Sequence, residues 1–359
     1  MPCIASISTK QPGSGCDHRS ILTRYVSARF IRLIPLSFVL ALAFATGLHA
    51  QPAGTSSLPV IRQALDRLYR MDYPGAEETL LEGLPATSPA RPYFAGTICL
   101  NRFLDWGDTV ALARAERYLE KLAPSDGPAP AFPGADPAEV RLYRGLAGIQ
   151  QSYIASLRGQ RLRPASLALT ARRQLLPLGA PEARATLILY DYYRGQILGK
   201  LPFVDAAEFP FAEFQRAADA SPTLRDMFLS SLFWILVDKA DKGDKGRIDQ
   251  ALRIINAFLE RYPDNRMARE MRGSALYRGK RFAEARTEYE NLREEYMGLK
   301  KSPDRLPLGY YRAVGNLARI YAALGLRPEA EARLAEWNRA GRSGVAPWLP
   351  ASLKDDLAK

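Results

Sequence analysis

The segment MRGSALYRGKRFAEARTEYENLREEYM, from Met271 to Met297, decides the fold because it reads as two amphipathic helices joined by a tight turn. Gly273 and Leu276 share one face of the first predicted helix. The turn follows at residues 279–281. Three positions at helical spacing then mark the second helix: Phe282, Ala285 and Tyr289. A small residue on each helix lets the two backbones approach closely, so this segment predicts a packed helical hairpin.

The same spacing returns further along the chain. Ala318 and Ala330 are twelve residues apart, as are Gly273 and Ala285. An earlier helix carries Ala251 at the equivalent place, 34 residues before Ala285, and this is the period of tetratricopeptide repeats. From Ala285 to Ala330 the distance is 45 residues, and the extra eleven fit the loop near residues 298–307. The positions predicted to pack the repeats together are Gly273, Leu276, Phe282, Ala285, Tyr289, Ala318, Tyr321, Gly325, Ala330 and Leu334.

The C-terminal third therefore resembles tetratricopeptide repeats, and the whole layout resembles divergent exported members of this family from bacterial envelopes. The resemblance implies an all-α fold, a right-handed α-solenoid of antiparallel helix pairs that is irregular in the middle. It also implies a superhelical scaffold whose concave face binds peptides or proteins. It implies no catalytic residue and no cofactor.

Apolar residues at three- and four-residue spacing extend this interpretation over the rest of the chain, where no alternating strand pattern is found. Pro-rich breaks suggest boundaries within one continuous stack. We expect N-terminal repeat-like helices over 51–123, a Pro-rich linker over 124–137, divergent helical repeats over 138–241, C-terminal repeats over 242–345 and a tail over 346–359. The apolar run FLSSLFWILV at 228–237 is too short to span a bilayer and predicts a buried helix.

The first fifty residues follow the three-part pattern of a secretory signal peptide with a long basic segment. Arginines up to Arg32 precede an uncharged run from Leu33 to Leu48, and a small residue, Ala50, offers a cleavage site. Alternatives are an uncleaved anchor, a mitochondrial transit peptide, or a translation start placed too far upstream. No cysteine follows the apolar run, where Gln51 stands, so lipid attachment is not expected. These features predict an exported, periplasmic or envelope-associated protein that is soluble and not a lipoprotein.

Removing residues 1–50 also removes most of the histidine and cysteine side chains that could act as nucleophiles or metal ligands. Both histidines lie in that segment, and of three cysteines only Cys99 remains. Histidine-based nucleophilic triads and a Cys/His zinc site are then out of reach for one chain. The segment holds five basic residues and one acid, so the net charge falls from +12 to +8, which gives no nucleic-acid footprint. We expect no metal, no nucleic acid and no transmembrane segment in the mature chain.

One cluster offers a binding surface. Tyr190, Tyr193 and Arg194 lie within LILYDYYRG, and tyrosine and arginine are favoured at interfaces. The alternative is that the rings fill gaps between irregular repeats. The function predicted is a non-catalytic scaffold for a protein or peptide partner. A structural or assembly subunit of an envelope complex is the second hypothesis, and an enzyme based on carboxylates or a lysine is the third.

Overall fold

The computed structural model describes residues 57–123, 131–160, 162–198, 208–221, 225–240, 245–299 and 306–340. The predicted signal segment 1–50 and the tail 346–359 lie outside the described residues, as do residues 124–130 of the predicted linker. Within the described part every regular element is a helix, which confirms the all-α prediction. The helices are α3 (Leu58–Tyr69), α4 (Tyr73–Gly83), α5 (Ala90–Trp106), α6 (Thr109–Glu120), α7 (Pro137–Leu157), α8 (Arg163–Leu175), α9 (Pro181–Leu198), α10 (Phe211–Asp219), α11 (Arg225–Lys239), α12 (Lys245–Arg261), α13 (Arg266–Arg278), α14 (Phe282–Gly298), α15 (Leu308–Ala323) and α16 (Arg327–Ala340).

Side-chain caps fix where several helices begin. The carboxylates of Asp72, Asp108 and Asp136 accept hydrogen bonds from the first backbone amides of α4, α6 and α7. The amide oxygen of Asn265 does the same for α13. Each cap satisfies a backbone N–H that the helix itself leaves without a partner. The short polar breaks of the sequence therefore start helices as well as end them.

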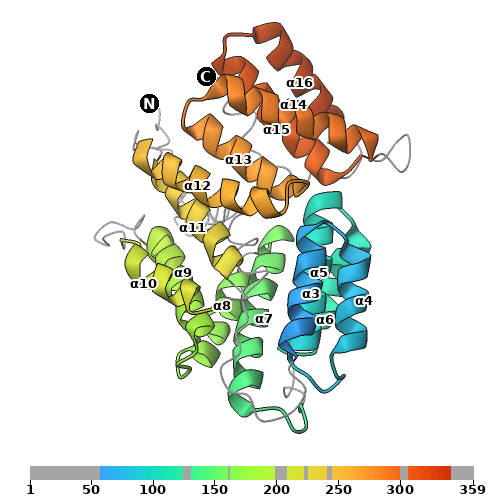
Figure 1. Cartoon of the computed structure of the whole chain (residues 1–359), viewed down its shortest axis with the longest axis vertical. Coiled ribbons are helices and arrows are strands. Elements are labelled where there is room, and N and C mark those ends of the chain that lie inside the picture. Colours follow the sequence, from blue (N-terminus) through green and yellow to red (C-terminus); the bar gives the residue numbers. More distant parts are fainter. Residues whose placement is uncertain are drawn as a thin grey trace, which may run out of the picture.

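Successive helices pack as pairs, starting with α3 against α4 and ending with α15 against α16. The pairs then stack in chain order, as Figure 1 shows. This arrangement is an α-solenoid of the tetratricopeptide kind. Helix length varies most in the middle, where α7 has 21 residues and α10 has nine.

In the pairs α5–α6, α7–α8 and α13–α14, the first helix is the more deeply buried one. In α5 all residues from Tyr93 to Asn101 are buried, so the helix is covered on every side. The outer helix α8 buries only Pro164, Ala171 and Leu175. The predicted buried helix at 228–237 is confirmed, because Phe228, Phe233 and most of its other apolar side chains are inaccessible in α11. None of the helices in the described part combines the length and apolarity needed to cross a bilayer.

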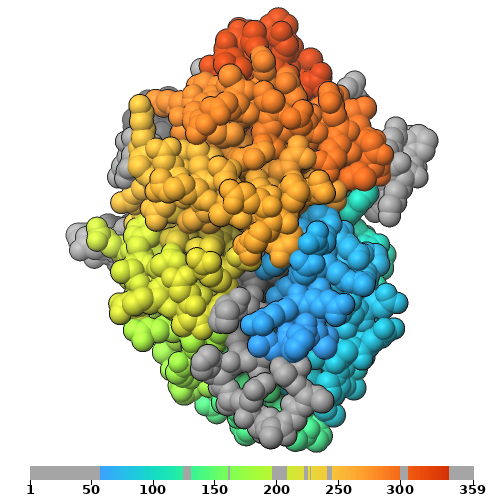
Figure 2. Space-filling view, viewed as in Figure 1, coloured from blue at the N-terminus to red at the C-terminus, as the bar shows by residue number. Residues whose placement is uncertain are grey.

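The stack curves until its N-terminal helices meet its C-terminal ones. Helix α5 packs against α15, and the Arg312 guanidinium of α15 donates a hydrogen bond to the Leu104 carbonyl of α5. Gly107 ends α5 with a φ of +71°, and a Cβ at this position would lie 3.3 Å from Leu308 Cβ. Figures 1 and 2 show the N-terminal helices, in blue, directly beside α13. We call this contact between the two ends of the stack the seam.

Candidate functional site

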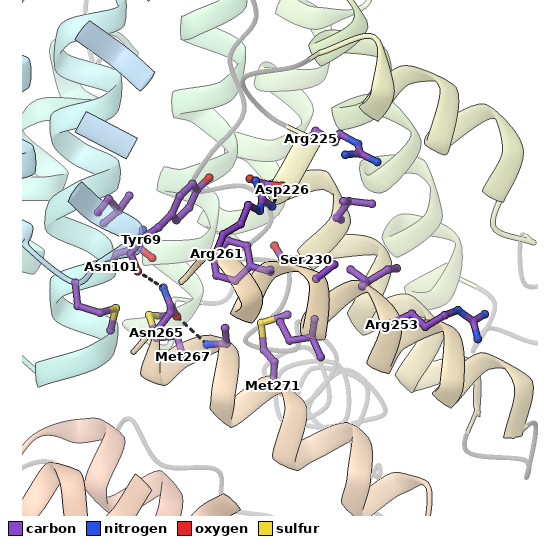
Figure 3. Close-up of a pocket in the computed structure, with 18 of the residues that line it drawn as sticks. Tyr69, Asn101, Arg225, Asp226, Ser230, Arg253, Arg261, Asn265, Met267 and Met271 are labelled. Atoms are coloured by element: carbon purple, nitrogen blue, oxygen red, sulfur yellow. Dashed lines mark hydrogen bonds and ion pairs between the residues drawn. The ribbon is translucent and has the colours of Figure 1, made fainter. Parts of the chain in front are cut away.

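The seam leaves a cavity of about 410 Å³ between the first helix pair and helices α10 to α13 (Figure 3). Its floor is buried and mostly apolar, and the side chains that form it are Leu68, Tyr73, Ile255, Met267, Ala268 and Met271. Two methionines four residues apart place flexible thioethers on one face of α13. The volume lies within the range of small ligand pockets, and it suits an apolar side chain or a chain of a few carbons.

The mouth of the cavity is positively charged. Arg225, Arg253 and Arg261 are exposed, and the carboxylate of Asp226 faces Arg261. The Arg261 Nη2 donates to Asp226 Oδ1 at 2.5 Å, and this hydrogen bond raises the pKa of Arg261 above its ordinary value. Arg225 also pairs with Asp219 at 2.9 Å, so three guanidinium groups face two carboxylates and leave the mouth with an excess of one positive charge. A ligand with an apolar portion and an anionic group would satisfy both zones.

Helix α12 supplies one wall because two faces of this helix carry different residues. Its core face includes Ile248 and Leu252, whereas Ile254, Phe258 and Arg261 point into the cavity lining. These three positions follow one another at spacings of four and three residues. The spacing alone predicts an amphipathic helix, but the element facing this second side is α3, which is nearly two hundred residues earlier in the chain.

Asn265 holds the far wall in place. Its Nδ2 donates to the Tyr69 carbonyl at 2.7 Å, while its Oδ1 accepts from the Ala268 amide at 2.8 Å (Figure 3). The Tyr69 ring packs edge-on against Phe258, with 5.2 Å between ring centroids. One side chain therefore caps α13 and also ties α13 to the end of α3. The walls of the cavity are fixed by these contacts before any ligand arrives.

Behind the floor, a buried polar network joins the same elements. Asp105 of α5 is fully buried, and its Oδ2 accepts from Arg266 Nη2 at 2.7 Å. Its Oδ1 accepts from the Tyr296 hydroxyl at 2.8 Å, and Oδ2 also accepts from the Tyr73 hydroxyl at 3.2 Å. Burial raises the pKa of both tyrosines well above the ordinary value, so they remain protonated donors. This network belongs to the seam and sets the distance between the cavity walls.

The aromatic cluster predicted as a binding surface lies elsewhere. Tyr190 is buried against Ile149 and Ala171, and the Arg172 guanidinium stacks 5.8 Å from its ring centroid. Tyr193 is half-buried and packs edge-on against its neighbouring tyrosine, whereas Arg194 is exposed. The two tyrosines lie three residues apart in the second half of α9, and none of the three predicted residues lies in the cavity lining.

The predicted repeat-packing positions lie between α13 and α16. A Cβ on Gly273 would come within 2.7 Å of the Tyr289 ring, so the two helices touch there. Six of the positions are buried: Gly273, Leu276, Ala285, Tyr289, Ala318 and Ala330. Phe282, Tyr321 and Leu334 are half-buried, and Gly325 adopts a φ of +74° in the turn before α16. These residues shape the solenoid and do not reach the cavity.

The residues of the cavity give no pattern that identifies a site in the sequence. Met267 and Met271 read as ordinary core positions, and Arg253 reads as part of a solvated helix face. Asn265 directly precedes α13, and asparagine favours the N-cap position of a helix, so this residue type is a local signal in the sequence. Within the described ranges, no three His, Cys, Asp or Glu side chains gather as a metal site would require. The arrangement offers apolar area and positive charge, which are means of binding.

Comparison with known proteins agrees with the architecture. Residues 241–298 match the tetratricopeptide repeat family, and this stretch contains α12, α13 and α14. A search of curated proteins finds no match. The matched repeats supply two walls of the cavity, and this part of the chain consists of tetratricopeptide repeats.

Proposed function

We propose that the chain is an exported scaffold that binds a protein partner at the cavity. A segment of the partner would place an aliphatic side chain on the methionine floor and an adjacent carboxylate among the arginines of the mouth. The single observation that carries this proposal is the combination of a buried apolar floor and an arginine rim in one cavity. Burying one aliphatic side chain contributes about 1.5–3 kcal/mol, and the charged rim would set orientation and rate of association.

The burial of the inner helices favours the cavity over a long groove. In an open solenoid the inner helices line a concave surface that a peptide can follow. Here the inner side chains of α5 and α15 pack against each other across the seam. A partner is therefore expected to insert a short anchor rather than to lie along the whole superhelix.

The leader supports the exported location. Its basic segment, apolar run and small-residue site are those of a secretory signal, and Gln51 stands where a lipidated cysteine would be needed. We place the mature protein in the periplasm or at the envelope. Tetratricopeptide repeats are generally non-catalytic interaction modules, and the proposal assigns no reaction to this chain.

The test uses the mature chain to capture partners from the envelope fraction of its own organism. Ala257 is exposed and lines the cavity, so Ala257→Trp should obstruct the mouth while leaving the core intact. Arg253→Glu should repel an acidic anchor. Both variants should lose most of the partner that the wild type captures, as quantified by mass spectrometry.

Two matched variants on α16 serve as controls. Ala332→Trp and Arg327→Glu make the same changes at exposed positions outside the cavity lining, and both should capture the partner as the wild type does. Equal capture by Ala257→Trp and Ala332→Trp would exclude the cavity as the binding site. Helical circular dichroism of all four variants verifies that each remains folded.

A further inference from the structure

Three leucines are exposed in a line along α8. Their exposed fractions are 84 % for Leu162, 48 % for Leu169 and 51 % for Leu176, among the highest of the large apolar side chains in the described part. Single exposed leucines are ordinary, but a regular row of them on one helix indicates an interaction surface. None of the three lines the cavity, so this surface is independent of the proposed function.

The spacing puts the three side chains on one face. They are seven residues apart, and the flanking positions Leu162 and Leu176 both have helical backbone angles, so the helix geometry runs through the whole row. Seven residues advance a helix by about 10.5 Å with a drift of about 20°. The row is therefore about 21 Å long and nearly straight. Ala165, also exposed, lies between its first two members.

The opposite face of α8 is held firmly. Leu175 and Ala171 pack on α7 where Gly145 and Gly148 leave room, because a Cβ at these glycines would come within 2.5 Å and 3.0 Å of them. Helix α8 lies beside α7 in the stack (Figure 1), and its pairing with α7 is extensive. The leucine row is thus presented on a rigid helix, which lowers the ordering cost of a partner.

The charge of α8 has one sign. Between Arg163 and Leu175 the helix carries Arg163, Arg172 and Arg173 and no acidic residue. Arg172 pairs with Asp191 of α9 at 3.3 Å, while Arg173 is exposed beside the row. From the leucine spacing and this charge we infer that α8 is a docking surface for an acidic amphipathic helix of a protein partner. Leucines of the partner would pack between those of the row, and flanking Glu or Asp side chains would meet the arginines.

The same charges disfavour a second copy of this chain. Suppose that two α8 helices pack antiparallel with Leu169 at the centre. Arg173 of each copy would then lie beside the first turn of the other copy's helix, which carries Arg163. Like charges placed together across an interface cost affinity, so self-association along this face is opposed. An acidic partner removes that repulsion and replaces it with attraction.

The test measures binding of two synthetic helical peptides by fluorescence anisotropy. Both peptides carry the same heptad row of leucines, one flanked by Glu and the other by Lys. The wild-type chain should bind the Glu peptide at least about tenfold more tightly than the Lys peptide. The triple variant Leu162→Gln, Leu169→Gln, Leu176→Gln should lose at least about tenfold in affinity for the Glu peptide.

A charge exchange gives the decisive comparison. The double variant Arg163→Glu, Arg173→Glu should reverse the preference, so that the Lys peptide binds more tightly. A helix surface that makes no charge-specific contact with the peptide would show no such reversal. Val110→Gln on α6 removes another exposed side chain, 66 % exposed, and should leave both affinities unchanged. All substituted positions are exposed, so circular dichroism should show unchanged helicity.

Three results would overturn the inference. One is equal affinity of the wild type and the triple leucine variant for the Glu peptide. Another is binding to phosphatidylglycerol vesicles that depends on the leucines while the Glu peptide is not bound. The third is a dimer in light scattering that the triple variant abolishes.

Discussion

Asp105 of α5 and Arg266 of α13 stand 161 residues apart in the chain, yet Arg266 Nη2 lies 2.7 Å from Asp105 Oδ2. The Asp105 side chain is fully buried and that of Arg266 is 9 % exposed. Tyr296 and Tyr73 complete the shell of donors around the carboxylate. The two ends of the solenoid are therefore joined by a charge pair that is largely shielded from water.

Asp105→Asn should destabilise the protein by up to about 3–5 kcal/mol, because the Arg266 guanidinium loses its buried carboxylate partner and keeps only Glu295, 3.3 Å away and partly exposed. Urea unfolding followed by circular dichroism measures the change. Glu331→Gln removes the partner of Arg327 in an exposed ion pair and should leave the midpoint nearly unchanged. Equal midpoints for the two variants would contradict a structural role of the buried pair.

Gly273→Ala should destabilise the C-terminal repeats by about 1–3 kcal/mol, because the added methyl would lie 2.7 Å from the Tyr289 ring. That ring cannot easily yield, since its hydroxyl donates to the Glu270 carbonyl at 3.0 Å. Gly298→Ala is the matched control, because a Cβ there meets no atom within 4 Å. Thermal unfolding of both variants measures the difference, and a stabilised Gly273→Ala would refute the close contact.

Cys99 should be unreactive in the folded protein. Burial, together with the nearby Glu77 carboxylate, raises the pKa of the Cys99 thiol to about 12, so almost no thiolate forms near neutral pH. A variant with Cys3 and Cys16 replaced by serine isolates this thiol. Ellman's reagent should label it slowly in buffer and fully in concentrated guanidinium, and rapid labelling of the folded chain would show that Cys99 is accessible.

The protein should lose stability at alkaline pH. Burial raises the pKa of Tyr69, Tyr73, Tyr153, Tyr289 and Tyr296 above the ordinary value of about 10. Above that pH the unfolded chain releases these protons and the folded chain keeps them. The free energy of unfolding is therefore unaffected by these groups below pH about 10, and it falls above this pH by about 1.4 kcal/mol per pH unit for each tyrosine.

Urea unfolding at a series of pH values, with tyrosinate absorbance as a second signal, checks this dependence. The five buried tyrosines should form tyrosinate in step with unfolding, as the difference in absorbance between the wild type and variants that lack one of these rings shows. Tyr153→Phe removes one of the five groups and should make the alkaline slope shallower by one proton. A tyrosinate step that precedes the loss of helical signal in the wild type and is missing in Tyr153→Phe would contradict the burial of this ring.

The repeat fold could be predicted because its signals are local. The 34-residue spacing from Ala251 to Ala285 links neighbouring repeats, and the apolar run of α11 lies within one helix. Gly273 faces Tyr289 only sixteen residues later, within one hairpin. Patterns of this length survive in the sequence because each hairpin must pack against itself.

The seam and the cavity could not be predicted in this way. Asp105 reads in the sequence as an acid near a helix end, and nothing nearby points to Arg266 or Tyr296. Their meeting depends on the curvature added by every pair between them, including the divergent middle. The cavity draws its lining from α3, α4, α5 and α10 to α13, so it exists only after that curvature has closed the stack.

The contact between α5 and α15 also has a consequence for folding during synthesis. The Leu104 carbonyl meets its Arg312 donor 208 residues later, which is about 10–40 s of translation at about 5–20 residues per second. During that interval α5, whose residues from Tyr93 to Asn101 are all destined for burial, has no C-terminal helices to cover it. The nascent chain therefore exposes apolar surface of α5 before α15 is synthesised. It is expected to depend on chaperones that shield this surface.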